Sequence, residues 1–472
     1  MKKFSLTVLF ILLASPAWAT TFFLAPASGG GNDSNNGTSA STPWLSPNHA
    51  VNCGDVIIAA ASTAYSAANF SSGRWGTVTC PGDDNVAWLK CATFDACKIS
   101  APSSDGMQIS SSYWGVQGWE ITTTGGSASD CFAATPPNSS TSIHHIVFAN
   151  DIATGCTGNG FDANYNNGAG TDYIAYVGSI AYKAASGSGV CASGLNIVNP
   201  TAHDSASGTH DYVAGNFSWL NVNPNPCAGT APTDGEGIIL DSIFTNGYTQ
   251  QMVIYNNIAI GNGGRGIEVL NNNSGSGARI YIKNNTTWGN ETQTSQAPGG
   301  SFGEIYLFQD QSMTVTANIA MTTRVNGPAG YPYYAYVVDS GTSTSTASGN
   351  VGYSASGNNA ISQYSNGFSF GTNLFGMNPN FSTPSIPGPP NCGSATSVPN
   401  CMATVISNFT PSGSAVGYGY QVPATGNVAD GLFPQWLCNV NLPSGLVTMG
   451  CLSSSSPSSS PAPPTNVSAT VN

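Results

Sequence analysis

A short repeat in the middle of the chain constrains the fold more than any other feature. From about residue 110 to about residue 355, an apolar strand runs into a small turn, often containing Asn, and a second apolar strand follows. The turn position is occupied, in order, by Asp151, Ser179, Asn216, Asn257, Asn285, Asn318 and Asn350. The gaps vary from 28 to 41 residues, as expected for stacked coils with loops of different length. The five consecutive Asn residues predict a ladder in which each side-chain amide bonds the backbone and amide of the next coil.

The repeats predict an all-β chain that forms a single right-handed parallel β-helix, with an N-terminal cap and disulfides. A helical solenoid would show an apolar period of 3.6 residues, which the repeats lack, and an immunoglobulin-like sandwich would lack the Asn ladder. The composition agrees with this prediction. Charged residues make up 7 % of the chain, Gly numbers 56, and the hydrophobic fraction of 40 % is enough to fill a core.

A third strand is expected in each coil after the Asn turn. Its candidates are residues 161–163, 195–197, 238–240, 267–269 and 305–307. Because side chains alternate faces along a strand, the middle residues should form one column that points away from the core. This column contains Asp162, Asn196, Ile239, Glu268 and Tyr306, and neighbouring columns add Asp241 and Glu304. With coils ~4.8 Å apart, several carboxylates would lie within ~5–10 Å of one another. For Asp162 and Glu304 we favour a solvated surface role.

The chain divides into five expected segments. Residues 1–19 form a signal peptide, residues 20–110 the N-terminal cap and first coils, and residues 111–355 the β-helix. Residues 356–452 form a segment containing Pro and Cys, which we expect to pack on the β-helix or cap it. Residues 453–472 form a Ser/Pro-rich linker and a stretch that resembles the start of a fibronectin type III module.

The N-terminus has the three parts of a secretory signal. Lys2 and Lys3 are the positive region, residues 6–14 the apolar core, and residues 17–19 an Ala-Trp-Ala cleavage site. We therefore expect a secreted bacterial protein, extracellular or periplasmic, without a later membrane span. The net charge of −12 argues against nucleic acid and anionic membranes as partners. We also expect a monomer.

Twelve cysteines in an exported chain indicate disulfides rather than a metal site. Pairing close neighbours predicts the bonds Cys53–Cys80, Cys91–Cys97, Cys131–Cys156, Cys191–Cys227, Cys392–Cys401 and Cys438–Cys451. This connectivity follows from loop length alone.

Two stretches about 30 residues apart share one pattern, a polar turn, a glycine and a short strand. We expect them to occupy equivalent places in successive coils. Residues 233–241 read Thr-Asp-Gly-Glu-Gly-Ile-Ile-Leu-Asp, and residues 264–270 read Gly-Arg-Gly-Ile-Glu-Val-Leu. Aligning their glycines places Asp234, Glu236 and Arg265 on turns that lead into the strands. Acidic residues are scarce in this chain and gather here, so this patch is the candidate site.

The export signal and the repeats together resemble the pectate-lyase-like superfamily of right-handed β-helices. Asp234-Gly235-Glu236 and the strand at residues 264–270 are most similar to family 9 polysaccharide lyases, and the resemblance covers roughly residues 20–355. It implies a polysaccharide substrate, calcium bound by acidic residues of successive coils, and a lysine that removes the proton next to a uronate carboxyl.

The chain has candidate ligands for the implied calcium ion, but it lacks a lysine at the position that the family motif gives. Asp211, Asp234 and Glu236 stand where the calcium-binding carboxylates would be expected. Glu268 stands where the family motif would place the lysine. The basic residues nearby, none of them at the motif position, are Lys183, Lys283 and Arg265.

Two reactions fit the acidic patch. Elimination needs a base for the C5 proton of a uronate, and a cation or Arg to neutralise its carboxylate. Hydrolysis needs two carboxylates, one protonated and one ionised, at a separation that sets the stereochemistry. Crowded carboxylates raise one another's pKa, which suits a general acid, and they also offer hard oxygen ligands for Ca²⁺. The catalytic candidates are Glu236, Asp241, Glu268, Arg265 and Lys283.

The substrate-binding candidates are His210, Asn196 and Tyr306, of which Tyr306 offers a ring for stacking on a sugar. Structural roles compete with these assignments, since Glu236 and Arg265 also suit a cross-coil ion pair and His210 a hydrogen bond at a coil edge. Two hypotheses therefore stand. One is a secreted enzyme that degrades a polysaccharide bound along the groove, as a calcium-assisted lyase or a carboxylate-based hydrolase. The other is a non-catalytic β-helix, secreted or at the cell surface, that binds carbohydrate or serves adhesion.

Overall fold

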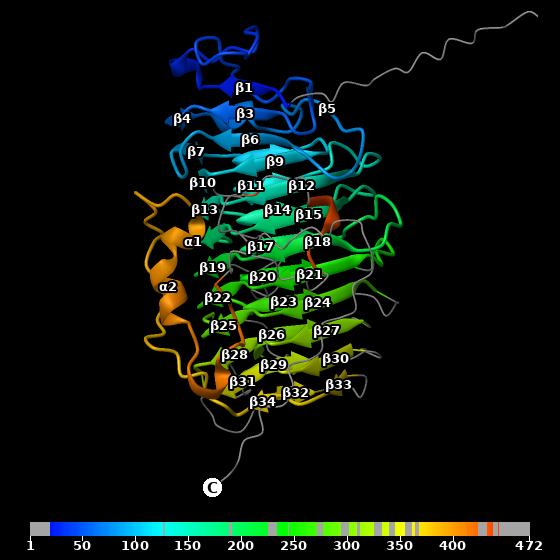
Figure 1. Ribbon diagram of the computed structural model, residues 1–472, viewed down its shortest axis with the longest axis vertical. Coiled ribbons are helices and arrows are strands. Elements are labelled where there is room, and N and C mark those ends of the chain that lie inside the picture. The colour runs from blue at the N-terminus through cyan, green and yellow to red at the C-terminus, as the bar shows by residue number, and fades with distance from the viewer. Residues whose placement is uncertain are drawn as a thin grey trace, which may run out of the picture.

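The computed structural model forms a tall stack of parallel strands with two short helices on one side (Figure 1). The structure describes residues 19–125, 128–187, 191–224, 234–243, 245–270, 277–293, 302–308, 312–324, 333–338, 345–354, 361–363, 368–422, 432–437 and 442. Its strands form three long sheets, and the pairings between the named strands are parallel. The predicted single parallel β-helix is therefore confirmed.

The three sheets run the length of the stack. The first sheet contains β1 (Thr21–Leu24), β3 (Val56–Ala59), β6 (Ala87–Cys91), β9 (Trp114–Gln117), β12 (Ile143–Ala149), β15 (Thr171–Val177), β18 (Thr209–Ala214), β21 (Gln251–Tyr255), β24 (Arg279–Lys283), β27 (Met313–Thr316), β30 (Ser345–Ser348) and β33 (Phe368–Phe370). The second sheet contains β4 (Ser62–Tyr65), β7 (Cys97–Ala101), β10 (Trp119–Thr123), β13 (Ile152–Thr154), β16 (Ile180–Tyr182), β19 (Phe217–Trp219), β22 (Ile258–Ile260), β25 (Thr286–Trp288), β28 (Ile319–Thr322), β31 (Val351–Ser354) and β34 (Leu374–Phe375). The third sheet contains β8 (Met107–Ile109), β11 (Phe132–Ala134), β14 (Phe161–Ala163), β17 (Leu195–Val198), β20 (Ile238–Asp241), β23 (Ile267–Leu270), β26 (Phe302–Phe308), β29 (Tyr333–Val338) and β32 (Ile361–Gln363).

Short elements complete the described chain. Near the N-terminal end, β2 (Val51–Asn52) pairs with β5 (Val78–Thr79). The remaining elements are the α-helices α1 (Val398–Cys401) and α2 (Ala403–Asn408) and the 3₁₀ turns η1 (Ala27–Gly29), η2 (Ala67–Asn69), η5 (Gly413–Ala415) and η6 (Gln435–Leu437). Among the described residues, no helix is long and apolar enough to cross a membrane.

The predicted Asn ladder lies at the turn from the first sheet to the second. Asn257 Oδ1 accepts hydrogen bonds from the backbone N and Nδ2 of Asn216 at 2.9 and 3.0 Å, and Asn257 Nδ2 donates to Asn285 Oδ1 at 2.9 Å. At the N-terminal end of the ladder, Asp151 and Ser179 occupy the same position. The further members, joined in the same way, are Asn318, Asn350 and Asn373. The ladder thus runs one coil beyond the prediction.

From Asp151 to Asn350, the residue just before each ladder position has a left-handed backbone. Its φ is 57° at Gly178, 56° at Asn256 and 62° at Gly349. Gly and Asn adopt this conformation at the lowest cost, so the turn itself explains the Gly-Asn and Asn-Asn pairs of the repeat.

A second ladder, which the sequence analysis missed, lies at the turn from the second sheet to the third. Asn221, Asn262 and Asn290 follow the first ladder by a constant five residues. Asn262 Nδ2 donates to Asn290 Oδ1 at 2.8 Å, and Asn290 N donates to Glu304 Oε1 at 3.0 Å. The surface role favoured for Glu304 is wrong, because this carboxylate is buried and ends the ladder. Burial raises the pKa of Glu304 to about 8, although both hydrogen bonds from Asn290 act in the opposite direction.

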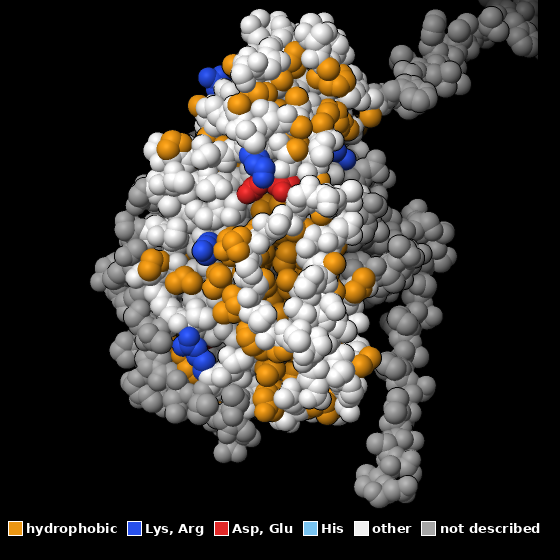
Figure 2. All heavy atoms as spheres, turned by 90° about the vertical axis from the view of Figure 1, so that its left-hand side faces the viewer, with side chains coloured by type: hydrophobic (Ala, Val, Ile, Leu, Met, Phe, Trp, Pro, Cys, Tyr) orange, Lys and Arg blue, Asp and Glu red, His pale blue; other side chains and the backbone are white. Residues whose placement is uncertain are grey.

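The C-terminal segment packs along the outside of the second sheet. Outward residues of that sheet such as Phe217, Ile258 and Ile319 form one buried cluster with Phe409 and Tyr420. Figure 1 shows α1 and α2 beside the second sheet, and Figure 2 shows this face with few charged side chains. Further along the chain, residues 432–437 cover the outer face of the first sheet near β15 and β18.

Four of the six predicted disulfides are present: Cys53–Cys80, Cys91–Cys97, Cys131–Cys156 and Cys392–Cys401. Each of the other two predicted pairs includes a cysteine outside the described residues. Most of the predicted signal peptide and all of the terminal linker also lie outside them.

Candidate functional site

The predicted outward column of the third sheet is present in the predicted register. Asp162 pairs with Asn196, and Ile239 pairs with Glu268, which in turn pairs with Tyr306. The flanking residues of these strands face the core, so the column points away from it. The solvated surface role favoured for Asp162 is wrong, because this side chain is 2 % exposed, and Glu268 of the same column is 4 % exposed. Polar groups of this column therefore act in a medium of low polarity.

Four charged side chains meet in this part of the third sheet, and we call Glu236, Glu268, Glu291 and Arg265 the Arg265 cluster. Arg265 Nη1 lies 3.4 Å from Glu236 Oε1 and 3.5 Å from Glu268 Oε2. Arg265 Nε lies 3.4 Å from Glu291 Oε1. Because Glu236 and Glu268 contact the same nitrogen, these two carboxylate oxygens are at most about 7 Å apart. The Tyr306 ring covers the guanidinium at 4.7 Å, in a cation–π contact.

Two glycines allow this close approach. Gly235 has φ +96°, a conformation that L side chains rarely adopt, and it turns the chain between Asp234 and Glu236. A Cβ at Gly264 would collide with the Glu236 carboxylate. The glycines that aligned the two stretches in the sequence therefore have a local steric reason.

The carboxylates outnumber the one cation, and this sets their protonation. Burial raises the pKa of Glu236 well above its usual range, and the charges of Glu268 and Asp234 raise it further, against Arg265 and a hydrogen bond from Ser193 Oγ. Burial raises the pKa of Glu291 to about 7, with Arg265 opposing it. Arg265 itself stays charged. The cluster thus combines a protonated carboxyl with a carboxylate that a guanidinium stabilises.

Other predicted residues of the third sheet lie close to the cluster. Asp241 ends β20, accepts a hydrogen bond from Ser242 Oγ at 2.9 Å, and has a pKa raised by burial. Asn196 Nδ2 donates to Asp162 Oδ1 at 2.9 Å. Burial raises the pKa of Asp162 well above its usual range, and the Asp130 charge raises it further.

Asp211 and Lys283 lie in the first sheet, away from the cluster. Asp211 accepts hydrogen bonds from Ile174 N at 2.9 Å and Tyr248 Oη at 2.7 Å, and Lys283 ends β24. Among the described residues, Asp211, Asp234 and Glu236 do not bring their carboxylate oxygens close enough together to hold one metal ion. The predicted calcium set is therefore not brought together, because Asp211 lies in β18 of the first sheet, whereas Asp234 and Glu236 lie just before β20 of the third sheet.

A second polar site, which the sequence analysis did not find as a unit, lies at the edge of the first sheet. Four rings from successive coils stack there, and we call them the ring column: Tyr113, His145, Tyr173 and His210. Their centroids are 5.1, 4.2 and 3.9 Å apart in that order. His145, Tyr173 and His210 each lie six residues before a position of the first ladder, namely 151, 179 and 216. Tyr113 lies six residues before Trp119, whose backbone N donates to Asp151 Oδ1 at 2.9 Å. This constant offset is the sequence signal that could have revealed the column.

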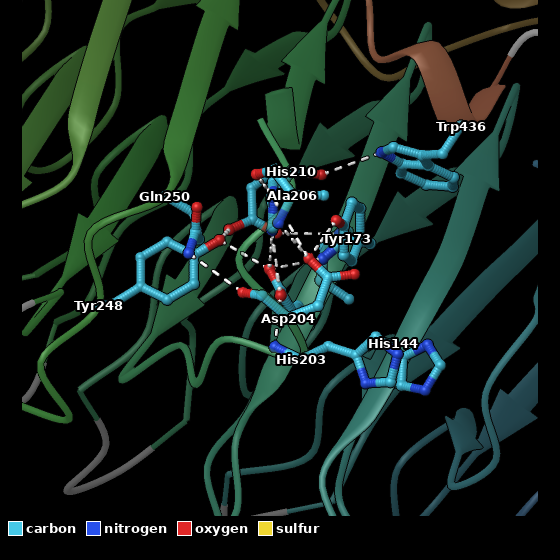
Figure 3. A network of polar contacts seen from close by, with 12 residues as sticks. His144, Tyr173, His203, Asp204, Ala206, His210, Tyr248, Gln250 and Trp436 are labelled. Carbon is cyan, nitrogen blue, oxygen red and sulfur yellow. Dashed lines mark hydrogen bonds and ion pairs between the residues drawn. The ribbon is translucent and has the colours of Figure 1, made fainter. Parts of the chain in front are cut away.

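His210 at the end of the ring column is held by bonds to both ring nitrogens. Nδ1 lies 3.0 Å from Asp172 Oδ1, and Nε2 lies 3.0 Å from the Ala206 carbonyl (Figure 3). A carboxylate and a carbonyl only accept, so both nitrogens donate and the ring is an imidazolium. Burial alone would lower the pKa of His210, but the hydrogen bond and charge of Asp172 raise it. The predicted coil-edge hydrogen bond describes His210 better than a substrate contact.

A cavity of about 280 Å³ opens beside the ring column, and we call it the histidine-lined cavity. Its walls include Asp83, His145, Tyr173, Asp204, Gln435 and Trp436. Tyr173 Oη donates to Asp204 Oδ1 at 2.8 Å, and Figure 3 shows Tyr173, Asp204 and His210 together, with His203 beside His144. Burial lowers the pKa of His145 to about 2, and the neighbouring histidines act in the same direction. His145 is therefore neutral at physiological pH.

Comparisons with known proteins support no closer identification. No family model matches the chain, and no curated protein is significantly similar to it in sequence. Among solved structures, the chain is similar to pectate lyase Pel9A, with 16 % identity, 75 % of this chain and 76 % of that chain covered, and a TM-score of 0.40. It is also similar to a rhamnogalacturonan lyase, with 14 % identity, 77 % and 91 % covered, and a TM-score of 0.35. A third is the A-module of the Azotobacter vinelandii mannuronan C-5 epimerase AlgE4, with 13 % identity, 67 % and 91 % covered, and a TM-score of 0.30. At these scores the fold assignment rests on the strand pairing described above.

Proposed function

We propose that the chain is a secreted carbohydrate-active enzyme that hydrolyses a glycan at the third sheet, with the Arg265 cluster as the reacting group. The observation that carries this proposal is the cluster itself, in which one guanidinium contacts three carboxylates at 3.4 to 3.5 Å. Such crowding keeps one carboxyl protonated beside an anionic one, which is the pair that glycoside hydrolysis requires. The disulfides fit an exported protein.

Glu236 and Glu268 take the two roles in this proposal. Protonated Glu236 gives its proton to the glycosidic oxygen as that bond breaks, and Glu268 supplies the carboxylate that activates water or attacks the sugar. The upper limit of about 7 Å between their oxygens permits the spacing of retaining glycosidases, roughly 5–5.5 Å, and only the lower end of the inverting range. Tyr306, Asn196 and Asp241 lie on the same face and are the proposed contacts for the sugar ring.

Hydrolysis fits the charges better than elimination. A lyase needs a cation to neutralise a uronate carboxylate, but among the described residues the Arg265 charge is already outnumbered by carboxylates. Glu268 occupies the motif position of the lysine, and Lys283 lies in the first sheet. Since the predicted calcium set is not assembled, no step is assigned to a calcium ion.

The test is hydrolysis of a panel of neutral and acidic glycans by the full chain, measured as new reducing ends. Glu236→Gln and Glu268→Gln keep the side-chain shape, and each should lower kcat at least ~100-fold, the usual effect of losing an acid or base. Glu120→Gln is the matched control, because Glu120 pairs with Lys98 in the second sheet. Equal activity in all four proteins would contradict the assignment.

A specific observation favours a second candidate, a non-catalytic carbohydrate-binding β-helix. Glu236 is 0 % exposed and the Arg265 side chain 14 %, so the cluster has the burial of a structural ion-pair group. This candidate predicts glycan binding without new reducing ends, and unchanged binding in Glu268→Gln.

A further inference from the structure

We propose that Asp83, His203 and Asp204 bind a divalent transition-metal ion, such as Zn²⁺, at the mouth of the histidine-lined cavity. Their ligand atoms all lie within 4.8 Å of one another, and no other group of this kind occurs among the residues that the structure describes. Asp83 precedes β6, whereas His203 and Asp204 precede β18, so the ion would join two loops about 120 residues apart in sequence. The site lies apart from the Arg265 cluster of the third sheet.

The three ligands are already held in place by their neighbours. Tyr173 Oη and the Ala206 backbone N each donate to Asp204 Oδ1 at 2.8 Å. The His203 ring stacks on His144 at 3.5 Å, and the His203 backbone N donates to Asp172 Oδ2 at 2.6 Å. Asp83 Oδ1 accepts a hydrogen bond of 2.5 Å from a tyrosine hydroxyl of the ring column. Ligands that are fixed before binding lose little conformational freedom when the ion arrives.

An independent observation points to a ligand in the adjoining cavity. His145 is completely buried, its ring forms part of the cavity wall, and its Nε2 has no hydrogen-bond partner of good geometry among the described residues. The Asp83 backbone raises the pKa of this ring, but burial and the neighbouring histidines, which lower it, have larger effects. A buried polar atom without a partner costs free energy, so a water or ligand oxygen in the cavity would stabilise it. Because Asp83 and Asp204 line the same cavity, such a group would also lie beside the metal ion.

The ligand set selects the class of metal. An imidazole nitrogen is a good ligand for Zn²⁺ and similar ions, whereas Ca²⁺ takes six to eight oxygens. Two carboxylates and one imidazole leave at least one tetrahedral position open, and this position would face the cavity. The site therefore suits a zinc-like ion with a bound water or ligand oxygen, rather than the calcium ion expected from the sequence resemblance.

The experiment is isothermal titration of the tag-free, EDTA-treated full chain with ZnCl₂, and separately with CaCl₂. We expect one Zn²⁺ per chain, weakened at least tenfold by His203→Gln and by Asp204→Asn, with little heat from Ca²⁺. His49→Gln is the matched control, because His49 forms a histidine–carboxylate pair with Asp33 elsewhere. A far-UV circular dichroism spectrum of each variant, with its melting temperature with and without Zn²⁺, separates lost binding from lost folding. Absence of Zn²⁺ binding, binding that His203→Gln leaves unchanged, or preferred binding of Ca²⁺ would overturn the proposal.

Discussion

The Arg265 cluster and the histidine-lined cavity are both polar sites on a β-helix, but they differ in burial and in charge. In the cluster three carboxylates surround one guanidinium and are largely buried, so protonation balances the charge. At the cavity the neutral His145 ring stacks on Tyr173, and Asp83 and Asp204 line an open volume. Removing a charge should therefore matter most in the cluster, and removing a ring nitrogen or hydroxyl should have smaller effects at the cavity.

The largest expected effect comes from Arg265→Met. Removing the cation leaves buried carboxylates without a compensating positive charge, which should lower the free energy of unfolding by about 4 kcal/mol. Denaturant unfolding measures this loss. Arg74→Met, at an exposed position, is the control and should change stability by less than about 0.5 kcal/mol. Equal stability of the two variants would show that the cluster is not a charge-balanced unit.

The second-largest effect should be the contribution of Glu291 to the pH dependence of stability. Its folded pKa of about 7 lies above its unfolded value, so its contribution is complete below about pH 4.5 and is lost as the pH rises toward 7. The loss should amount to about 3 kcal/mol for this group. Glu291→Gln should flatten that part of the profile, as followed by urea unfolding at several pH values. A variant profile parallel to that of the wild type would contradict the assigned proton.

His145 should act with the opposite sign. Its pKa is depressed on folding, so its contribution is present above about pH 6.5 and is lost as the pH falls. Between about pH 6.5 and 5 the loss should be about 2 kcal/mol in metal-free protein. His145→Phe keeps a ring in the column and should remove this acid-side loss, whereas His49→Gln should retain it. The two groups thus change the free energy of unfolding in opposite directions over overlapping pH ranges below neutrality.

Tyr173→Phe gives the smallest effect. It keeps the stacked ring and removes the hydroxyl that donates to Asp204, which should lower the free energy of unfolding by about 1 kcal/mol. The same variant should weaken Zn²⁺ binding, since Asp204 loses a group that fixes it. Unchanged Zn²⁺ affinity would indicate that the loop backbone alone positions this ligand.

The sequence predicted those parts of the molecule in which one residue per coil has a fixed place. The first Asn ladder and the third-sheet register follow from the fold, because a coil imposes the same turn at each level whatever the loop length. The second ladder lies five residues after the first ladder in sequence, and the ring column lies six residues before it. Both could therefore have been predicted from the same repeat.

Other features depend on how loops fold back, and spacing alone does not determine that. The Arg265 and Glu236 pair was predicted because both precede aligned strands, but Glu291 reaches the cluster from the turn after β25. Asp211 was assigned to the wrong neighbourhood, since its strand belongs to the first sheet. Burial of Asp162 and Glu268 also depends on what covers the third sheet, which a strand pattern does not contain.

The most direct test of the central claim is the chemistry of the product formed at the Arg265 cluster. Wild-type protein, treated with EDTA, should release reducing ends from a glycan without the ultraviolet absorbance of an unsaturated uronide. This result is expected because two carboxylates hydrolyse a glycosidic bond without a metal or a lysine. Absorbance that appears with the product and disappears with EDTA would contradict the hydrolase and indicate a calcium-dependent lyase.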